Sequence, residues 1–183
     1  DFAHTRYLML WGVAEDHDSN PLKLGLGQLK ARGAKVVAIN PVRTGYAAIA
    51  DEWIAIRPGT DGLLAGALIR DVLRCDRIDL EFLVRYTNAH WLVLDAPGGA
   101  TDGLVARDAD GHPLCATRDG GIARADAVGI SPRVVGEVTL VDGQRAVPAF
   151  ERLAARYLAP DYAPHTVADR CGVDAETIRR LAR

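Results

Sequence analysis

The sequence predicts an α/β fold: a Rossmann-like parallel sheet flanked by helices, with a small antiparallel β-hairpin excursion and a helical C-terminal segment. The apolar run 36–39 is rich in β-branched residues, is too short for a helix and ends abruptly at Asn40 and a proline. A second apolar run, 53–56, is followed by a Pro-Gly turn signal. From about residue 100 to 147, Asp-Gly pairs separate short apolar runs, a pattern typical of hairpins.

The chain divides into three parts on this pattern. We expect a Rossmann-like core over 1–99, a β-hairpin insertion of the same domain over 100–148, and a helical segment over 149–183. A chain of 183 residues, with 49% hydrophobic and 25% charged residues, is ordinary for a globular domain.

Charge and hydropathy narrow the function classes. The net charge of −2 gives no electrostatic case for nucleic acid as a partner. No apolar run approaches the roughly twenty residues of a membrane span. The three cysteines, Cys75, Cys115 and Cys171, lie far apart and show no metal-ligand spacing, so we expect reduced thiols and no metal site built from this chain.

The first elements form a β-α-β unit. The run 7–11 predicts a strand ended by Gly12, and a polar loop follows. Asn20 then caps a helix that ends at Gly33. The apolar positions along this helix are Leu22, Leu24, Leu26, Leu29 and Ala31. Lys35 opens the central strand, and the crossover should be right-handed.

Two strand ends supply polar residues to one edge of the sheet. After a short helix over 47–51, the strand 53–56 leads to Thr60, a candidate helix cap, and to Asp61 in the first turn of a helix that runs to about residue 74. Ligands of open α/β sheets bind at the carboxyl ends of the strands. The alternative interpretation is that both strand ends are ordinary turns and caps.

Caps, turns and short apolar runs predict the remaining elements of the chain. Asp79 caps a short helix, 92–94 is a fourth strand, and the runs 104–106 with 113–116 and 138–141 with 145–147 form two hairpins. The stretch 108–111 favours a plain turn over a calcium loop, because the full ligand spacing is absent. Helices follow over 150–158 and on either side of Gly172, with Asp174 as the last cap. The final pair also resembles a DNA-binding helix-turn-helix, which the acidic net charge disfavours.

His17 lies in the first loop beside three carboxylates. It is a candidate ligand contact or catalytic base, and a solvated loop histidine is the alternative that we prefer.

Three ordered motifs resemble the molybdopterin oxidoreductases of the dimethyl sulfoxide reductase family. They are LMLWGVAEDHDSNP at 8–21, INPVRTGYAAIADEW at 39–53 and IRPGTDG at 56–62, and the closing YAPHTVADRCGVDAETIRRLA at 162–182 resembles a later stretch of the same enzymes. The resemblance implies a middle domain that holds one molybdopterin guanine dinucleotide. Asn40 stands where an acid is frequent in the family.

The resemblance also implies roles for individual residues. Those along the first loop, beside the dinucleotide, are Trp11, Gly12, Val13 and Asn20. Those around the guanosine and its phosphates are Asn40, Pro41, Val42, Arg43 and Thr44. Those that meet the guanine are Gly59, Thr60 and Asp61. A carboxylate accepts two hydrogen bonds from a guanine edge, and an arginine engages a phosphate with two parallel donors.

The resemblance implies that the full-length protein is a molybdenum or tungsten oxidoreductase similar to formate dehydrogenase or nitrate reductase. A 4Fe-4S cluster and the metal ligand are expected upstream of this segment, so we expect no catalytic residue and no turnover from the segment alone. The implied partners are the remaining domains of the same enzyme and an electron-transfer subunit. We expect a cytoplasmic location, with the periplasm left open.

The competing hypothesis is a non-enzymatic α/β interaction module. Its contact surface would be an apolar face of the helical tail, formed by Val167, Ile178 and Leu181. This hypothesis requires those three side chains to be exposed rather than packed into the core of the domain.

Overall fold

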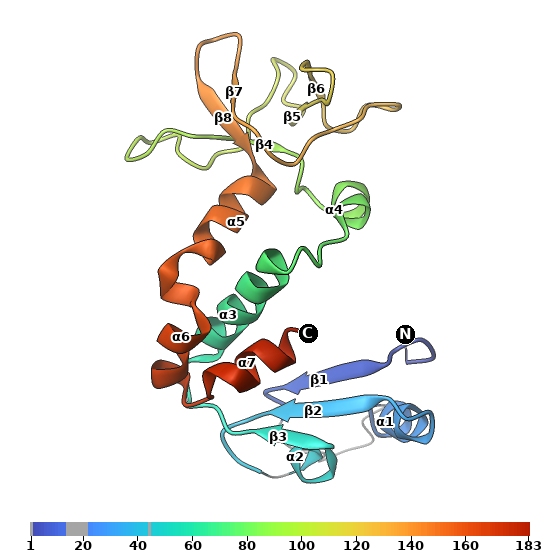
Figure 1. Ribbon diagram of the computed structural model, residues 1–183. Coiled ribbons are helices and arrows are strands. Elements are labelled where there is room, and N and C mark those ends of the chain that lie inside the picture. The colour runs from blue at the N-terminus through green and yellow to red at the C-terminus, as the bar shows by residue number, and fades with distance from the viewer. Residues whose placement is uncertain (1, 14–21, 44) are drawn as a thin grey trace. The chain divides into compact units, whose positions relative to one another are not determined.

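The protein forms two compact units. The computed structural model describes residues 2–13, 22–43 and 45–183. The first unit combines the residues up to Leu68 with Pro160–Arg183, and the second unit is Ile69–Ala159. Within the first unit, the red carboxyl-terminal helices lie beside the blue and cyan strands of the amino-terminal region (Figure 1).

The first unit is built on a three-stranded parallel sheet of order β1-β2-β3. Its strands are β1 (Tyr7–Trp11), β2 (Lys35–Ile39) and β3 (Glu52–Ile54). The central strand β2 is buried from Val36 to its end, as its β-branched run predicts for a strand covered on both faces. The predicted parallel sheet, with the strand from Lys35 at its centre, is therefore confirmed.

Strand β3 differs from the prediction, which placed it over 53–56. It begins at Glu52 and ends at Ile54, whose partner in β2 is Ile39. The ladder stops there because β2 itself ends before Asn40 and Pro41, so residues beyond Ile54 have no strand to pair with.

Helices α1 (Leu22–Ala31) and α2 (Tyr46–Ile49) belong to the same unit. Of the apolar positions along α1, Leu24 is 76% exposed. The buried stripe of α1 follows Leu26 and Leu29, and a 3.6-residue period leaves Leu24 outside that stripe. Helix α2 also ends earlier than the predicted 47–51, and the carboxylate of Asp51 instead accepts a hydrogen bond from Val36 N at 2.8 Å.

One face of the sheet packs against α1 and α2. The buried residues of this cluster are Leu10, Leu26, Leu29, Ala34, Val36, Ala38, Tyr46 and Ala47. Alternation along β2 sends Val36 and Ala38 to this face and Val37 and Ile39 to the other.

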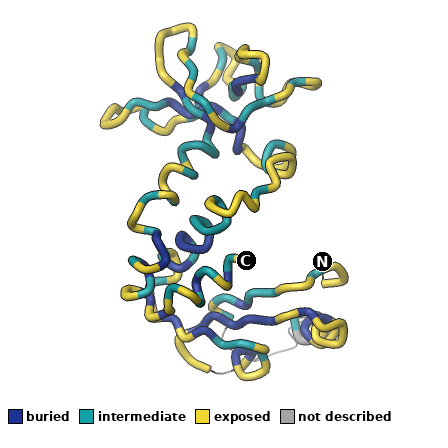
Figure 2. The backbone as a smooth tube through the Cα atoms, viewed as in Figure 1, coloured by how far each residue is buried: buried dark blue, intermediate teal, exposed yellow. Residues whose placement is uncertain are grey.

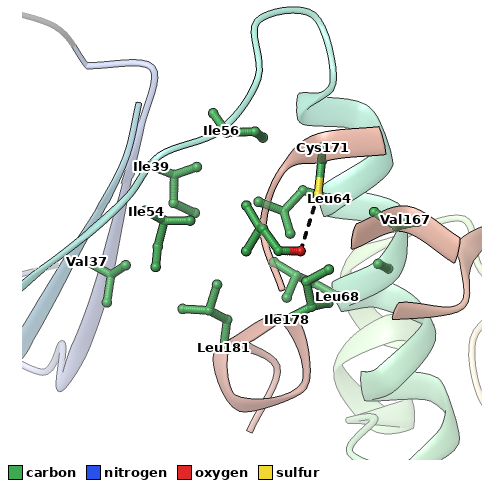
Figure 3. Packing of buried hydrophobic residues seen from close by; sticks show 12 residues of the cluster. Val37, Ile39, Ile54, Ile56, Leu64, Leu68, Val167, Cys171, Ile178 and Leu181 are labelled. Carbon is green, nitrogen blue, oxygen red and sulfur yellow. Dashed lines mark hydrogen bonds between the residues drawn. The ribbon is translucent and has the colours of Figure 1, made fainter. Parts of the chain in front are cut away.

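The other face of the sheet packs against helices that are far apart in the sequence. These are α3 (Asp61–Arg74), α6 (Pro164–Cys171) and α7 (Ala175–Leu181), and a short turn, η1 (Pro160–Tyr162), precedes α6. The buried residues of this second cluster are Val37, Ile39, Ile54, Ile56, Leu64, Ala67, Leu68, Val167, Cys171, Val173, Ile178 and Leu181. Figure 3 shows side chains of the tail helices directed toward those of the sheet and α3.

The tail helices α6 and α7 do not present the exposed apolar contact surface that the interaction-module hypothesis requires. Val167 and Ile178 are fully buried and Leu181 is 5% exposed, all within the core cluster. Asp174 caps α7 by accepting a hydrogen bond from Thr177 N, and Gly172 ends α6 at φ 76°, both as predicted.

The second unit contains the antiparallel strands. Its larger sheet has the order β4-β8-β7, formed by β4 (Leu92–Leu94), β7 (Val138–Thr139) and β8 (Arg145–Pro148). Its smaller sheet pairs β5 (Leu114–Ala116) with β6 (Ile122–Arg124). Its helices are α4 (Leu80–Tyr86), capped by Asp79 as predicted, and α5 (Ala149–Leu158). The core joins the two sheets through Leu92, Leu94, Ala106, Ala116 and Ala146.

The predicted hairpin turns lie in this unit. Asp142-Gly143 connects β7 to β8, with Gly143 at φ 83°, where glycine is the favoured residue. The other predicted hairpin is only partly formed: Leu114 N donates to Ala106 O at 3.0 Å, but 104–106 makes an isolated bridge rather than a strand, and β5 pairs with β6 instead. The carboxylates of Asp108 and Asp110 both bind Arg124, at 2.6 and 2.5 Å, so this stretch is an arginine-bound turn.

Among the described residues, no helix combines the length and the apolar character that a membrane crossing requires.

Candidate functional site

The carboxyl edge of the parallel sheet brings three loops together. Strand β1 ends at Trp11, β2 at Ile39 and β3 at Ile54, and all three strands run in the same direction. The loops that follow them therefore leave from one edge, which is where open α/β sheets bind ligands.

Trp11 and Asp61 connect two of these loops directly. The indole Nε1 of Trp11 donates a hydrogen bond to Oδ1 of Asp61 over 2.7 Å. Asp61 is the first residue of α3 and is exposed, while Trp11 is half-buried and packs against the second core cluster. A carboxylate in the first turn of a helix also interacts favourably with the helix dipole. The exposed carboxylate is therefore held in a defined place.

Asn40 connects the first loop to the central strand. It is 5% exposed, and its Nδ2 donates to Val13 O at 2.9 Å. Its backbone oxygen accepts a hydrogen bond from Trp53 Nε1 at 2.9 Å, and its backbone nitrogen donates to Ile54 O at 3.2 Å. The side-chain amide nitrogen thus holds the loop after β1 rather than standing free in solvent.

Two glycines leave open space along the same edge. Gly12, at φ 68°, donates from its nitrogen to Ile39 O at 3.1 Å, and Gly59 has φ 78° in the turn before α3. A Cβ atom added to either glycine would meet no atom within 4 Å. A ligand can therefore approach the backbone at both turns.

Thr60 is turned differently from the prediction. Its hydroxyl does not cap α3 but donates to Arg57 O at 2.7 Å, and the backbone oxygen of Thr60 instead accepts from Leu63 N and Leu64 N. The Pro-Gly turn between Arg57 and Thr60 brings the hydroxyl back over the Arg57 carbonyl, which explains the difference.

The predicted site residues fall into three groups. Hydrogen bonds link Trp11 to Asp61 and Val13 to Asn40, while Gly12, Gly59 and Thr60 lie in the turns between them. Pro41, Val42 and Arg43 are exposed in the loop after Asn40. Asn20, Thr44 and the candidate His17 lie outside the described residues.

Two further residues support this edge and were not predicted. Trp53 bonds to the Asn40 carbonyl, as described above. Arg57 Nη1 donates to Asp169 O at 2.6 Å, and Arg57 N donates to Cys171 O at 2.9 Å. These bonds tie the turn before Asp61 to helix α6. The sequence signal for these two residues was their position, Trp53 at the start of the predicted strand 53–56 and Arg57 directly after its end.

Two acids with lowered pKa values in this unit, Asp51 and Glu52, lie at the start of β3, the amino end of the strand, and a third, the helix cap Asp174, has its pKa lowered by hydrogen bonds from Thr177. Hydrogen bonding from the Arg180 guanidinium holds the pKa of Glu52 below its ordinary value, despite the opposing effect of burial. The backbone hydrogen bond from Val36 lowers the pKa of Asp51. Both acids are engaged in bonds that stabilise the sheet. Within the part of the chain that the structure describes, no cluster of three or more His, Cys, Asp or Glu side chains could hold a metal ion.

Comparison with known proteins finds relatives that align with the whole of this chain. No protein-family model matches the chain. It is 42% identical over 194 aligned residues to a sulfite dehydrogenase subunit of Allochromatium vinosum, with all of this chain and 20% of that protein covered. It is 30% identical to the catalytic subunit of a putative dimethyl sulfoxide reductase of Halobacterium salinarum and 27% identical to the alpha subunit of perchlorate reductase of Dechloromonas aromatica, again over its whole length, covering 22% and 24% of those proteins.

A solved structure supports the fold. Acetylene hydratase from Pelobacter acetylenicus matches with a TM-score of 0.53 and 24% identity, covering 100% of this chain and 17% of that one. The chain therefore spans about a fifth of the length of the curated relatives it matches.

Proposed function

We propose that this chain, which is homologous to one segment of the molybdopterin oxidoreductases, binds the guanosine half of a molybdopterin guanine dinucleotide at the carboxyl edge of its parallel sheet. The observation that carries the proposal is the hydrogen bond from Trp11 to Asp61, which fixes an exposed carboxylate at the edge where α/β sheets bind nucleotides.

The chemistry of the residues fits a guanosine diphosphate group. The Asp61 carboxylate accepts hydrogen bonds only, and guanine presents two neighbouring donors on one edge. The exposed guanidinium of Arg43 suits a phosphate with two parallel donors. The open space beside Gly12 and Gly59 admits a ligand to the backbone of both turns. Asn40 stabilises the first loop of the site, because its side-chain amide donates a hydrogen bond to the carbonyl of Val13.

The role of this segment is to hold and orient the cofactor. When bound, a molybdenum or tungsten pterin supplies the two-electron or oxygen-atom transfer. The residues of this chain would bind its nucleotide end through Asp61 and Arg43, and we assign none of them a proton-transfer or metal-ligand role. A 4Fe-4S cluster belongs to the proposal for the whole enzyme and not to this segment.

For the whole protein we propose a molybdopterin-dependent oxidoreductase with more than one type of polypeptide, which acts on a sulfur oxyanion. Support comes from the 42% identity, over the entire chain, to a sulfite dehydrogenase subunit. The formate- and nitrate-type activities suggested by the sequence motifs stay predictions. The proposed partners are the remaining domains of the enzyme and an electron-accepting subunit.

The test is a calorimetric titration of the chain with GDP and CDP. Because half of a dinucleotide pocket lies outside this segment, we expect weak binding, with GDP preferred. Asp61→Ala should weaken GDP binding about tenfold, the equivalent of about 1.4 kcal/mol, and remove the preference for guanine. Asp161→Ala, which removes an exposed carboxylate elsewhere in the same unit, is the matched control. Equal binding of GDP and CDP that Asp61→Ala leaves unchanged would refute the guanine role.

A further inference from the structure

The second unit carries a cleft of about 530 Å³ between α4 and the loop 130–135. We call it the basic cleft. Its apolar lining includes Leu80 and Val84 from α4 and Ile130 from the loop. A volume of this size is typical of sites that enclose a ligand group or an anchoring side chain.

Three arginines line the basic cleft against a single acid. They are Arg85, Arg118 and Arg133, and the acid is Glu81. In the described part of the chain, none of the three guanidinium groups forms an ion pair. The cleft is therefore positive within a chain whose net charge is −2.

Three other arginines of this unit do form ion pairs. Arg124, Arg145 and Arg152 each bind at least one carboxylate, at 2.5 to 2.7 Å for their shortest contacts. By contrast, Arg133 has a buried Nε without a hydrogen-bond partner, and its Nη2 contacts Glu137 O at a long 3.4 Å. That nitrogen is enclosed by protein atoms, whereas Arg85 and Arg118 are exposed and, within the described part of the chain, their guanidinium groups have no hydrogen-bond acceptor. These two groups give the cleft donor capacity that the folded chain does not use.

Helix α4 presents apolar side chains beside the cleft. None of its residues is buried, and Figure 2 shows the helix as intermediate or exposed throughout. Leu80 is 44% exposed and lines the cleft together with Val84. Phe82 and Tyr86 are also exposed, but they lie on another face of α4 and are not among the residues that line the cleft. Arginine, which lines the cleft beside these apolar side chains, is a type enriched at the centres of protein interfaces.

We propose that the basic cleft docks an acidic segment of a partner polypeptide, with an apolar side chain of that segment as its anchor. Charge complementarity favours this occupant, because carboxylates match the planar fork of each arginine and would satisfy the unused donors. The apolar walls of the cleft, among them Leu80, Val84 and Ile130, require more than a simple anion, since an inorganic anion would leave them in water. A peptide with alternating acidic and apolar side chains meets both requirements.

The first test measures peptide binding to the full 183-residue chain by fluorescence anisotropy. The probe is a labelled peptide in which glutamates alternate with leucines. We expect Arg85→Gln with Arg118→Gln to weaken its binding by about tenfold or more, since close charge pairs at interfaces contribute strongly. Arg74→Gln with Arg156→Gln removes the same charge from exposed positions outside the cleft and should have little effect. Leu80→Ala should also weaken binding without altering the circular dichroism spectrum, because Leu80 lines the cleft and is 44% exposed.

Peptide variants separate the proposal from other occupants. A glutamine-leucine peptide that binds equally well would overturn the acidic requirement, and a glutamate-alanine peptide that binds equally well would overturn the apolar anchor. If inorganic phosphate at matched ionic strength displaces the probe completely at low concentration, the cleft is a small-anion site and the proposal fails. Self-association of the chain that the double arginine variant abolishes would instead assign the cleft to a second copy.

A second test distinguishes a partner from other domains of the same polypeptide. In the longer enzyme chain that contains this segment, Leu80→Cys in a Cys75→Ser background places a reporter thiol in the cleft. If a maleimide labels this thiol rapidly in the longer chain alone and slowly only in the assembled enzyme, the result supports docking of a partner. If the thiol is already protected in the longer chain alone, other domains of the same polypeptide cover the cleft, and the proposal is overturned.

Discussion

The indole nitrogen of Trp11 donates to the carboxylate of Asp61 across 2.7 Å, although fifty positions separate the two residues in sequence. Asp61 has two oxygens, and the indole bond to Oδ1 restricts how the group can rotate. Trp11 therefore acts as a positioning residue for the carboxylate that we assign to guanine.

Trp11→Phe tests this relationship. The change removes the donor and retains an aromatic ring, so we expect unfolding to become easier by about 1 kcal/mol. Discrimination between GDP and CDP should fall, because the carboxylate is no longer held. Urea unfolding and calorimetry measure the two effects. A variant that loses stability but keeps full discrimination would restrict Trp11 to a structural role.

Asn40→Leu tests the support of the first loop. The variant leaves Val13 O without its donor in a largely buried position, so we expect a loss of about 1–3 kcal/mol in urea unfolding. GDP affinity should also decrease, because Val13 belongs to the proposed site. Asn88→Leu, at an exposed position, is the control. Unchanged stability in Asn40→Leu would show that water replaces the amide at no cost.

Glu52→Gln tests a predicted dependence of stability on pH. Glu52 pairs with Arg180 and, at 3.1 Å, with Lys35, and hydrogen bonding from Arg180 lowers its pKa below the ordinary 4.5. The folded state thus binds fewer protons than the unfolded state near that pH, so this contribution is complete above pH 4.5 and is lost as the pH falls through the folded-state pKa. The stability difference between wild type and variant should shrink on acidification. Glu176→Gln, which removes the carboxylate of an exposed pair with Arg179, is the control.

Ile178→Ala tests whether the tail is part of the core. The Ile178 side chain is fully buried, so its truncation should destabilise the protein by about 2–5 kcal/mol. Leu24→Ala, at a position that is 76% exposed, should change stability by no more than about 0.5 kcal/mol. Thermal and urea unfolding compare the two. Similar small effects in both variants would restore the helical tail as a free surface.

Local signals in the sequence were sufficient for much of the fold. The β-branched run of β2 and the proline after it predicted a buried parallel strand, and the caps at Asp79 and Asp174 are each satisfied within three residues. The Asp-Gly pair at Gly143 likewise specifies its hairpin through a backbone angle that glycine adopts readily. Each of these features depends on neighbours in sequence.

The contacts that organise the candidate site could not be predicted in this way. The bonds from Trp11 to Asp61 and from Asn40 to Val13 join loops that only the assembled sheet brings together. The Thr60 hydroxyl had two acceptors within reach by sequence, the helix end and the turn, and only the backbone geometry of the turn selects Arg57 O. The amphipathic pattern of α1 was also ambiguous, since Leu24 is apolar but lies off the buried stripe.

The first unit is discontinuous along the chain, and this has a consequence for biosynthesis. The strands and the start of α3, which carries Asp61, leave the ribosome early, but α6 and α7, which complete the cover over Val37 and Ile39, follow only after Ile69–Ala159 has been made. Because domains tend to fold as units during translation, the nascent sheet must wait with one apolar face only partly covered. Synonymous codons that slow elongation within that intervening stretch should therefore increase the demand of this protein for chaperones.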